Sequence, residues 1–557
     1  DLPLGEKVKL SSTASFQYVG ERYENFDRVY EKEYGRVWNF NDLGARATER
    51  LGEGGVALTF FDDISVSADG GYRLFGDSLE TIRQQYMFRS RDSTVLMGEY
   101  KYVDLNTTNR KNNTRSRWRR HNGDLYHAFN PKWRLGTEIW MEDRNETRGD
   151  SLSTGSFEFY DFTPYLAKSG KDFEFTLKFN YRYDKAFTDS AYRERSRNWG
   201  PAMTANWQPN RNFRLTSTAN YQNFELLDTA FTDQGLRDEQ TFLSNLQAAY
   251  STNNRAFRVN SIYEVLSEQA ARRQVVYVQV NPGQGQFEWI DYDDDGVQDL
   301  DEFQVSVNPI TANFVQVLSP TTELFPAVGV KLGNNLQLNL KAVIGKSDNF
   351  FVELIRNFSA QTALRLRQQR LRSGELEDYA ISFEQDLQAQ QQDTTLLSSR
   401  LHIQQDVWFY RNSRTFETGF TFIENRDRQF LQSGNEFRRR RSFATHQRYN
   451  LSLKQSFENT LEYGLNRNTA ELLPERNYDI EYWRVLPKVN YQASRKLRFS
   501  LGYEYQWKVN AIDTLINSEE IERRNSTINS HKLILDGRLN FKGRNNIFGK
   551  LEILRIN

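Results

Sequence analysis

A strict two-residue alternation of apolar and polar side chains runs along Lys496–Asn510. The apolar positions are Leu497, Phe499, Leu501, Tyr503, Tyr505, Trp507 and Val509. In an extended chain successive side chains point to opposite faces, so this segment has one apolar face and one polar face. Its length matches the roughly 9–11 residues that a tilted strand needs to cross a bilayer. The pattern therefore predicts a membrane-spanning β-strand.

The same alternation recurs along the chain, and short polar turns separate many of the runs. Further alternating runs are Phe173–Tyr183, Val56–Phe60 and Leu336–Leu340. The predicted turns include Phe61–Ile64, Phe129–Trp133, Trp207–Phe213, Leu332–Leu336, Glu458–Asn459 and Ala493–Lys496. Many neighbouring turns lie about 40 residues apart, which fits two membrane-length strands and one longer loop. We therefore predict an all-β protein, an antiparallel transmembrane β-barrel of about 24–26 strands with long outer loops and short inner turns.

Longer charged segments lie between the short turns, and we expect them to be the outer loops. They are Asp143–Thr154, Asp184–Trp199, Glu225–Gln240, Asn425–Arg441, Asn468–Tyr478 and Asn510–Ser530. The upper strand count assumes that Val8–Val19 pairs with Arg36–Arg50. We expect residues 1–557 to form a single barrel with one long loop insertion, Leu266–Pro326. That insertion is the only segment that we expect to be long enough to fold into the lumen or cap it.

Composition supports a membrane barrel and argues against some other classes of protein. Lys+Arg and Asp+Glu both number 73, so the basic excess that is typical of nucleic-acid binders is missing. Aromatic residues reach 14% although the mean hydropathy is −0.75, as expected where only a lipid-facing surface is apolar. The sequence has no cysteine, which excludes disulfides and thiolate metal sites.

The predicted insertion contains a calcium-type loop that runs from Asp291 to Glu302. The stretch matches the D-x-D-x-D-G-x5-E pattern over twelve positions. The expected Ca²⁺ ligands are Asp291, Asp293, Asp295, Val297 through its carbonyl, Asp299 directly or through water, and Glu302. The flanks read as extended, which favours a solitary structural calcium loop over a paired-helix sensor. The alternative is a solvated acidic loop that holds no ion.

Few residues suggest catalysis. No serine lies in a nucleophile-elbow pattern, and the five histidines form no close metal-type pair. We therefore predict no catalytic residues, no organic cofactor and no enzymatic activity. Two basic clusters, Arg438–Arg441 and Arg115–Arg120, could hold lipopolysaccharide phosphates, because guanidinium matches phosphate geometry. The alternative is ordinary charge that nearby acidic side chains balance.

Phe287–Ile290, the acidic loop and Phe303, followed by strands with Asn/Arg-rich turns, resemble large outer-membrane β-barrel proteins of Bacteroidota. The resemblance implies an exported protein of the outer membrane that acts as a transporter or as a subunit of an assembly or secretion complex. It also implies contact with outer-membrane lipid and with other outer-membrane proteins or lipoproteins. One departure is the chain's last residues, Leu554–Asn557, since such barrels usually end on an aromatic residue.

Three functions stay open from the sequence. The first is a channel or a subunit of an outer-membrane transport, secretion or assembly complex, with a structural calcium loop. The second is a scaffold whose outer loops dock surface lipoproteins, and the third is a barrel hydrolase. A serine–histidine pair on the lipid face would favour the hydrolase.

Overall fold

The computed structural model describes most of the chain and divides it into two compact units. The described residues are 2–3, 7–21, 34–39, 47–91, 95–188, 191–234, 237–291, 298–306, 312–374, 376–381, 395–431, 434–473, 476–494, 496–510, 526–540 and 546–556. The first unit comprises Asp1–Pro209 with Thr216–Leu243, and the second comprises Asn210–Leu215 with Ser244–Asn557.

The N-terminal half of the chain is a series of antiparallel strands, most of them joined by short connections, with α1 in the longer connection between β2 and β3. Its elements are β1 (Leu2–Pro3), β2 (Val8–Val19), α1 (Tyr34–Trp38), β3 (Glu49–Phe60), β4 (Ile64–Phe75), β5 (Leu79–Ser90), β6 (Met97–Asn109), β7 (Thr114–Asn130), β8 (Trp133–Arg148), β9 (Ser151–Leu152), β10 (Phe157–Lys168), β11 (Phe173–Thr188), β12 (Ala191–Asn210), β13 (Phe213–Leu226) and η1 (Thr229–Gln234). From β2 to β12 each long strand pairs with the next long strand along the chain.

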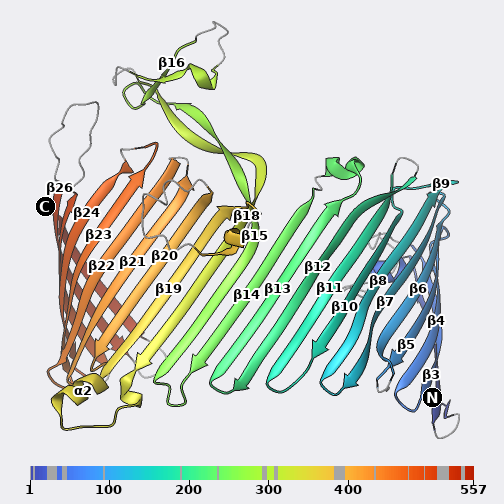
Figure 1. Cartoon of the computed structure of the whole chain (residues 1–557), viewed down its shortest axis with the longest axis horizontal. Coiled ribbons are helices and arrows are strands. Elements are labelled where there is room, and N and C mark those ends of the chain that lie inside the picture. The colour runs from blue at the N-terminus through green and yellow to red at the C-terminus, as the bar shows by residue number, and fades with distance from the viewer. Residues whose placement is uncertain are drawn as a thin grey trace. The chain divides into compact units, whose positions relative to one another are not determined.

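The C-terminal half continues in the same way. Its elements are β14 (Glu239–Ser251), β15 (Phe257–Gln279), β16 (Phe287–Trp289), η2 (Leu300–Glu302), β17 (Phe303–Val305), β18 (Phe314–Asn339), η3 (Leu340–Ala342), α2 (Phe350–Arg356), β19 (Phe358–Leu371), η4 (Leu376–Tyr379), β20 (Leu396–Phe409), β21 (Phe416–Leu431), β22 (Gly434–Asn450), β23 (Gln455–Ala470), β24 (Tyr478–Gln492), β25 (Leu497–Asn510), β26 (Ser526–Asn540) and β27 (Asn546–Ile556). β15 pairs with β18, and from β18 to β27 each strand pairs antiparallel with the next (Figure 1).

These strands confirm the predicted fold class, the antiparallel strand pattern of a transmembrane β-barrel. Of the 27 strands among the described residues, four (β1, β9, β16 and β17) have two or three residues, which leaves 23 long strands. That number is close to the 24–26 that the turn spacing predicts. The long strands have 11–26 residues, so all of them can cross a bilayer.

The predicted faces of β25 are also confirmed. Phe499, Leu501 and Tyr503 are 43–48% exposed on one face, whereas Ser500 and Gly502 between them are buried. We call the first surface the apolar face and the opposite one the polar face, on this strand and on the strands in register with it. In the first unit, Phe179 and Tyr181 of β11 lie on the corresponding apolar face.

Asparagine side chains close several hairpins, as the turn pattern predicts. The Asn130 side-chain oxygen accepts hydrogen bonds from the backbone N–H groups of Lys132 and Trp133, at 2.9 and 3.0 Å. Asn210 closes the β12–β13 turn with the same pair of bonds. At the β3–β4 turn, Phe61 and Asp62 adopt positive φ angles of 55° and 64°, which fits a tight hairpin.

Several segments that were predicted as turns or loops are strand instead. Leu332–Leu336 lies inside β18, and Glu458–Asn459 lies inside β23. Much of the predicted loops Asp184–Trp199 and Asn425–Arg441 also belongs to strands. The two loop predictions were wrong because the strands continue beyond their apolar stretch, where charged side chains form ion pairs such as Arg197–Glu225 and Arg441–Glu424.

The predicted pairing of Val8–Val19 with Arg36–Arg50 holds only at one end, where Tyr18 pairs with Arg50 and Val19 with Glu49. β2 does span Val8–Val19, but it pairs with β3, in register from Val8–Phe60 to Val19–Glu49. The beginning of the Arg36–Arg50 segment belongs to α1 instead.

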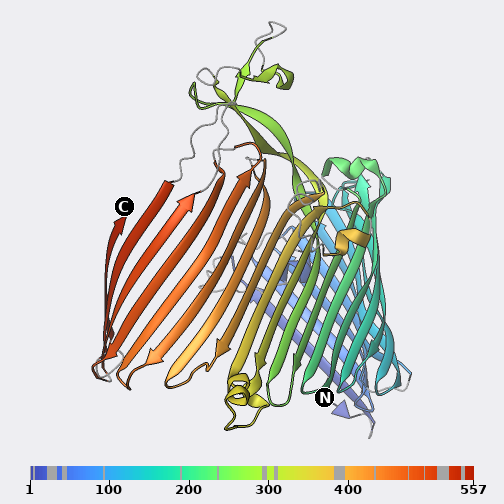
Figure 2. The same ribbon diagram turned by 60° about the vertical axis from the view of Figure 1, so that its left-hand side comes forward.

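The segment Leu266–Pro326 mostly continues the β15–β18 hairpin. The register runs from Phe257–Leu338 to Gln279–Phe314, with one irregularity between Ala271 and Arg273. This hairpin and the short pair β16–β17 form an arm that extends beyond the neighbouring strands of its unit (Figures 1 and 2).

Candidate functional site

α1 covers the polar face of β3–β5 in the first unit. Trp38 is 2% exposed and packs against Leu51 of β3 and Phe75 of β4. Gly71 lies directly beneath the indole, since a Cβ added there would lie 2.5 Å from Trp38 Cη2. A glycine at this position of β4 therefore gives the ring the space to lie flat against the sheet.

A buried ion pair lies beside Trp38. Arg73 donates a hydrogen bond from Nε to Glu49 Oε1, and these side chains are 0% and 1% exposed. The Tyr34 hydroxyl of α1 donates to the same Glu49 oxygen. Burial, together with this hydrogen bond, raises the pKa of the Tyr34 phenol. These hydrogen bonds link α1 to β3 and β4. Removing any one of the three side chains would leave a buried polar group without its partner, which is costly.

A second attachment point of α1 is Glu142 of β8, which is 4% exposed. Its carboxylate accepts hydrogen bonds from Arg36 at 2.7 Å, Trp140 at 2.8 Å and Trp118 at 3.1 Å. Trp118 also packs with Val103 and Leu105, forming an apolar patch on the polar face. The buried Glu142 carboxylate and the apolar patch around Trp118 therefore lie on the otherwise polar face of this unit.

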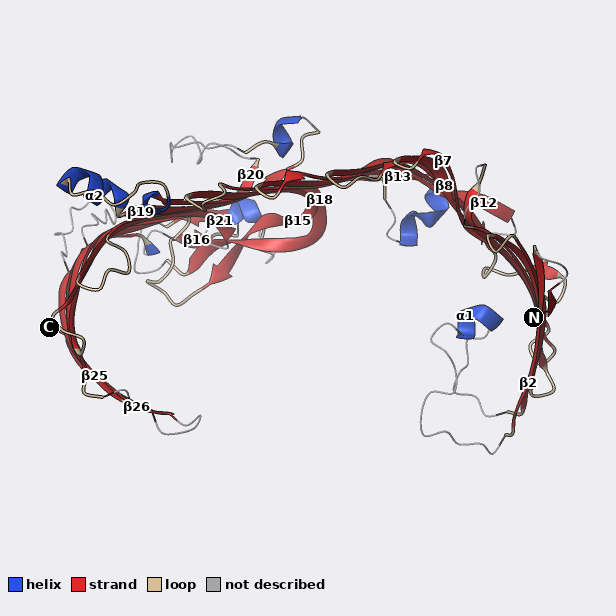
Figure 3. Cartoon of the chain, turned by 90° about the horizontal axis from the view of Figure 1, so that it is seen from below, coloured by secondary structure: helices blue, strands red, loops and turns tan. Residues whose placement is uncertain are grey.

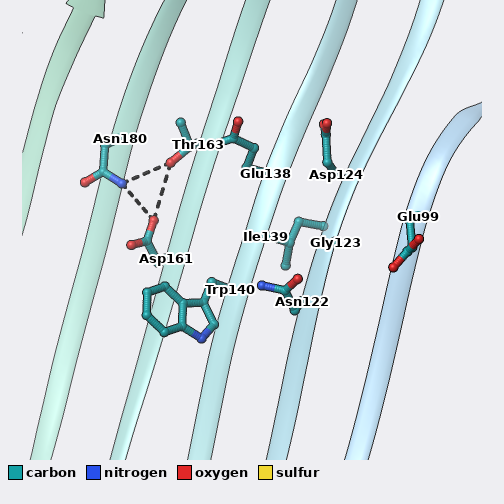
Figure 4. Close-up of a pocket in the computed structure, with 10 residues that line it drawn as sticks. All are labelled: Glu99, Asn122, Gly123, Asp124, Glu138, Ile139, Trp140, Asp161, Thr163 and Asn180. Atoms are coloured by element: carbon teal, nitrogen blue, oxygen red, sulfur yellow. Dashed lines mark hydrogen bonds between the residues drawn. The ribbon is translucent and has the colours of Figure 1, made fainter. Parts of the chain in front are cut away.

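A polar pocket of about 520 Å³ opens on the same face, between β6 and β11 (Figure 4). Its lining residues are Glu99, Asn122, Gly123, Asp124, Glu138, Ile139, Trp140, Asp161, Thr163 and Asn180. At one end, the Asn180 amide donates hydrogen bonds to Asp161 at 2.7 Å and to Thr163 at 3.0 Å (Figure 4). At the other end, Tyr165 donates to Asp124 at 2.7 Å.

Four carboxylates line the pocket. The basic side chains that pair with them are fewer and lie beside the pocket. Arg89 pairs with Glu99 at 2.7 Å, and Lys178 pairs with Glu138 at 2.6 Å. The Asp161 carboxylate lies 4.0 Å from the Arg182 guanidinium, which makes this the longest of the three ion pairs. Carboxylates, amides and a hydroxyl in one hollow can accept and donate hydrogen bonds to a polar solute, with an electrostatic preference for cations.

The structure places three of the predicted calcium ligands. Asp291, Asp299 and Glu302 are described, whereas Asp293, Asp295 and Val297 lie outside the described residues. Strands β16 and β17 pair Trp289 with Phe303, and the Ile290 N–H donates to the Glu302 carbonyl at 3.0 Å. This ladder brings the first and last positions of the acidic loop together, in agreement with the extended flanks.

Glu302, the last of these positions, is fixed by neighbouring groups. It is 5% exposed, and its Oε2 accepts hydrogen bonds from Trp289 Nε1 at 2.8 Å and from the Asp299 N–H at 3.3 Å. Across the described part of the chain, no three histidine, aspartate or glutamate residues are grouped as a metal site requires.

The predicted basic clusters both lie in strands. In β22, Arg439 and Arg441 reach the Glu424 carboxylate of β21 at 2.9 and 3.2 Å, and Arg426 reaches it at 2.7 Å. We call Arg426, Arg439 and Arg441 the arginine triad, and Glu424 is the carboxylate that they share. They lie on the apolar face, beyond the Phe422–Phe443 ring pair and towards the end that carries the arm.

The Arg115–Arg120 cluster belongs to β7 and is largely neutralised. Arg117 pairs with Asp104 at 2.7 Å, and Arg119 pairs with Asp143. The Arg120 guanidinium lies 4.7 Å from the centre of the Trp118 ring. These contacts fit the alternative given above for the cluster, in which nearby acidic side chains balance its charge.

The histidines give no support to a serine hydrolase. Within the described residues, each histidine has a hydrogen-bond partner other than serine. The pairs are His121–Tyr100, His127–Val95 carbonyl, His402–Asn425, His446–Thr460 and His531–Tyr503.

Comparison with known proteins gives structural likeness alone. No protein-family model and no curated protein matches the chain. The chain is similar to the siderophore receptor PirA from Pseudomonas aeruginosa (10% identity, 82% of this chain and 72% of that chain, TM-score 0.30). It is similar to the copper transporter OprC (8%, 90% and 74%, TM-score 0.30) and to the alcaligin receptor FauA from Bordetella pertussis (10%, 92% and 76%, TM-score 0.30). None of the described helices is long and apolar enough to span a membrane.

Proposed function

We propose that this chain is a non-enzymatic outer-membrane β-barrel protein that provides a passage for polar solutes along its polar face. The observation that carries the proposal is the division of membrane-length strands into one apolar and one polar, charge-paired face. On β25 and its neighbours, Leu501 and Tyr503 occupy the first face, whereas Lys488 and Asp536 pair at 3.4 Å on the second. A bilayer accepts such a sheet only when its polar face lines an aqueous lumen.

Single-cysteine labelling tests this arrangement without background, because the natural chain has no cysteine. We expect a charged, membrane-impermeant thiol reagent to label Glu504→Cys in reconstituted vesicles and to spare Leu501→Cys. A lipid-soluble maleimide should label Leu501→Cys. Equal labelling of both positions by the charged reagent would overturn the assignment of the faces.

The acidic pocket supports a finer proposal, a preference of the passage for cations. The reconstituted protein should conduct ions across planar bilayers with potassium favoured over chloride. Asp124→Asn together with Asp161→Asn should lower that preference, whereas Asp348→Asn, outside the pocket, should not. Unchanged selectivity in the double variant would remove the pocket from the passage.

The β15–β18 arm favours a second role, as a subunit of a larger outer-membrane complex. Its tip is held by stacked rings, with Tyr277 and Phe303 centred 4.0 Å apart, and Val278 and Val305 remain 46% and 69% exposed. Exposed apolar side chains on a projecting arm suit the docking of a lipoprotein or another outer-membrane protein. Purification in mild detergent should retain a partner that Val305→Glu releases.

We propose a structural calcium ion in the Asp291–Glu302 loop. The support is the complete twelve-residue motif together with the β16–β17 ladder that joins its ends. Tb³⁺ luminescence sensitised by Trp289 should appear in the natural protein and weaken in Asp293→Asn/Asp295→Asn. If no signal appears and calcium does not change protease cleavage of the arm, the loop is a solvated acidic turn.

We also propose that the arginine triad contacts lipopolysaccharide phosphates. Three guanidinium groups surround a single carboxylate, so two positive charges remain in excess, and the arginine side chains are 21–34% exposed. Arg439→Gln/Arg441→Gln should lower the amount of lipopolysaccharide that co-purifies with the protein. Arg117→Gln, in the neutralised cluster, is the control.

A further inference from the structure

The connection between β18 and β19 forms the α-helix α2, whereas the β20–β21 and β22–β23 connections are short turns. α2 begins after Asn349, whose side chain accepts hydrogen bonds from the N–H groups of Phe351 at 3.0 Å and Val352 at 3.4 Å. It ends at Arg356, and the side chain of the next residue, Asn357, donates to the Glu353 carbonyl at 2.8 Å. Capping at both ends within one short segment indicates a defined local structure.

This segment carries large apolar side chains that the protein does not cover. Phe350 and Phe351 are 67% and 71% exposed, and their rings meet edge to face at 5.6 Å. Ile355 and Val343 are 51% and 61% exposed. Four such side chains in one connection form an apolar patch, and such a patch marks an interaction surface.

The patch lies on the apolar side of its unit. Figure 3 shows α2 and β16 on opposite sides of the sheet of this unit. η4, the short helix beside the β20 label, lies on the α2 side, and its Tyr379 carbonyl accepts a hydrogen bond from Tyr263. Tyr263 belongs to the apolar face, because it is in register with Leu332 and, through it, with Leu366.

The apolar face continues directly into this patch. Phe358 follows α2 and packs edge to face against Phe409 at 5.5 Å, and Phe416 packs against Tyr449 at 4.7 Å. These aromatic residues lie where their strands meet the turns at the α2 end. An aromatic row at the limit of an apolar band is typical of the membrane interface.

We propose that α2 is an interfacial anchor, whose apolar side chains insert at the boundary between headgroups and acyl chains of the leaflet at this end of the barrel. The inference rests on the proposed membrane location and adds a lipid contact outside the strands. Lys341 and Lys346 are exposed on the same connection, whereas Arg356 of α2 is 12% exposed and pairs with Glu353. The two exposed lysines suit anionic phospholipid headgroups.

The test uses single-cysteine proteins that carry an environment-sensitive fluorophore, in vesicles of phosphatidylethanolamine with phosphatidylglycerol. Phe351→Cys reports the patch, Lys346→Cys is a polar control on the same connection, and Leu501→Cys reports the barrel's own lipid face. We expect spin-labelled lipid to quench Phe351→Cys at least about twofold more than Lys346→Cys, with iodide showing the reverse order.

The three positions separate the two proposals. If Leu501→Cys is quenched by lipid but Phe351→Cys is quenched only by iodide, α2 is not an anchor and the barrel assignment stands. If Leu501→Cys also escapes lipid quenching, the proposed membrane location fails. A disulfide-linked dimer of Phe351→Cys without lipid quenching would overturn the proposal in favour of a second copy of the chain.

Discussion

Truncating Trp38 to alanine is expected to release α1 from the polar face while the strands beneath it stay paired. Trp38 is the most deeply buried residue of its apolar cluster. α1 has five residues, and a helix this short is not stable without tertiary contacts. The loss should therefore fall on docking of the segment and not on the strand ladder.

The expected size of the effect follows from the burial. Removing a fully buried aromatic side chain costs about 3–5 kcal/mol, which corresponds to roughly a 10²–10⁴-fold increase in the ratio of undocked to docked protein. Gly71→Ala should act in the same direction by another route, because the added Cβ would lie 2.5 Å from the indole and displace it. Trp207→Ala, which removes a 43% exposed tryptophan far along the sequence, is the matched control.

Hydrogen–deuterium exchange with mass spectrometry measures the release. Amides of residues 34–39 should exchange faster in Trp38→Ala and Gly71→Ala, whereas those of β3 and β4 should keep their protection. Unchanged exchange at residues 34–39 would refute the assignment of Trp38 as the main attachment. Equal loss of protection in β3 and β4 would show that Trp38 stabilises the sheet itself.

Two further predictions concern the buried network beside Trp38, and one concerns the apolar face of β25. Glu49→Gln should destabilise the protein by about 3–5 kcal/mol, because the buried Arg73 loses its counter-charge, and Glu49→Gln/Arg73→Met should recover part of the loss in urea unfolding. Leu501→Arg should cost about 2–4 kcal/mol in the same assay and Glu504→Gln far less, since only the first places a charge against lipid. The raised pKa of Tyr34 means that the undocked phenol ionises first, so docking of α1 should weaken as pH rises above 10.0, and exchange in Tyr34→Phe should lack this dependence.

The sequence was sufficient to predict the strands and their faces. The two-residue period is a property of the extended backbone, so the exposure of Phe499 and Leu501 could be read directly from their positions. Turns were predictable where the side chain itself makes the turn, as at Asn130 and Asn210. Both signals are local and need no knowledge of distant contacts.

Strand ends were not predictable in this way. Asn425–Arg441 is rich in charge and was expected to be a loop. In the structure, the Glu424 carboxylate forms ion pairs with three arginines from two strands, and these pairs stabilise the hairpin. From the sequence alone, a charged side chain in an ion pair cannot be distinguished from one that is exposed to solvent. Only the register of β21 and β22 distinguishes the two.

The polar face of the first unit shows a similar limit. The sequence of α1 gave no sign that Trp38 would lie over Gly71, because residues that far apart along the chain are related only by the fold. The pocket is likewise assembled from five strands, and its four carboxylates lie far apart in the sequence, so none of them stands out by spacing. The calcium loop differs because its whole motif is contiguous.

The two ends of the apolar face in the second unit carry different chemistry, and this difference favours an orientation in which the β15–β18 arm lies on the outer side of the membrane. The arginine triad lies towards the end that carries the β15–β18 arm, whereas Phe358, Phe409 and α2 lie at the opposite end. Arginines match the phosphates of lipopolysaccharide, and an amphipathic helix with exposed phenylalanines matches a phospholipid leaflet. The reverse orientation would place guanidinium groups in the phospholipid leaflet and α2 among lipopolysaccharide. Lipid quenching at Phe351→Cys and lipopolysaccharide retention by Arg439 and Arg441 therefore test one orientation from opposite sides of the membrane.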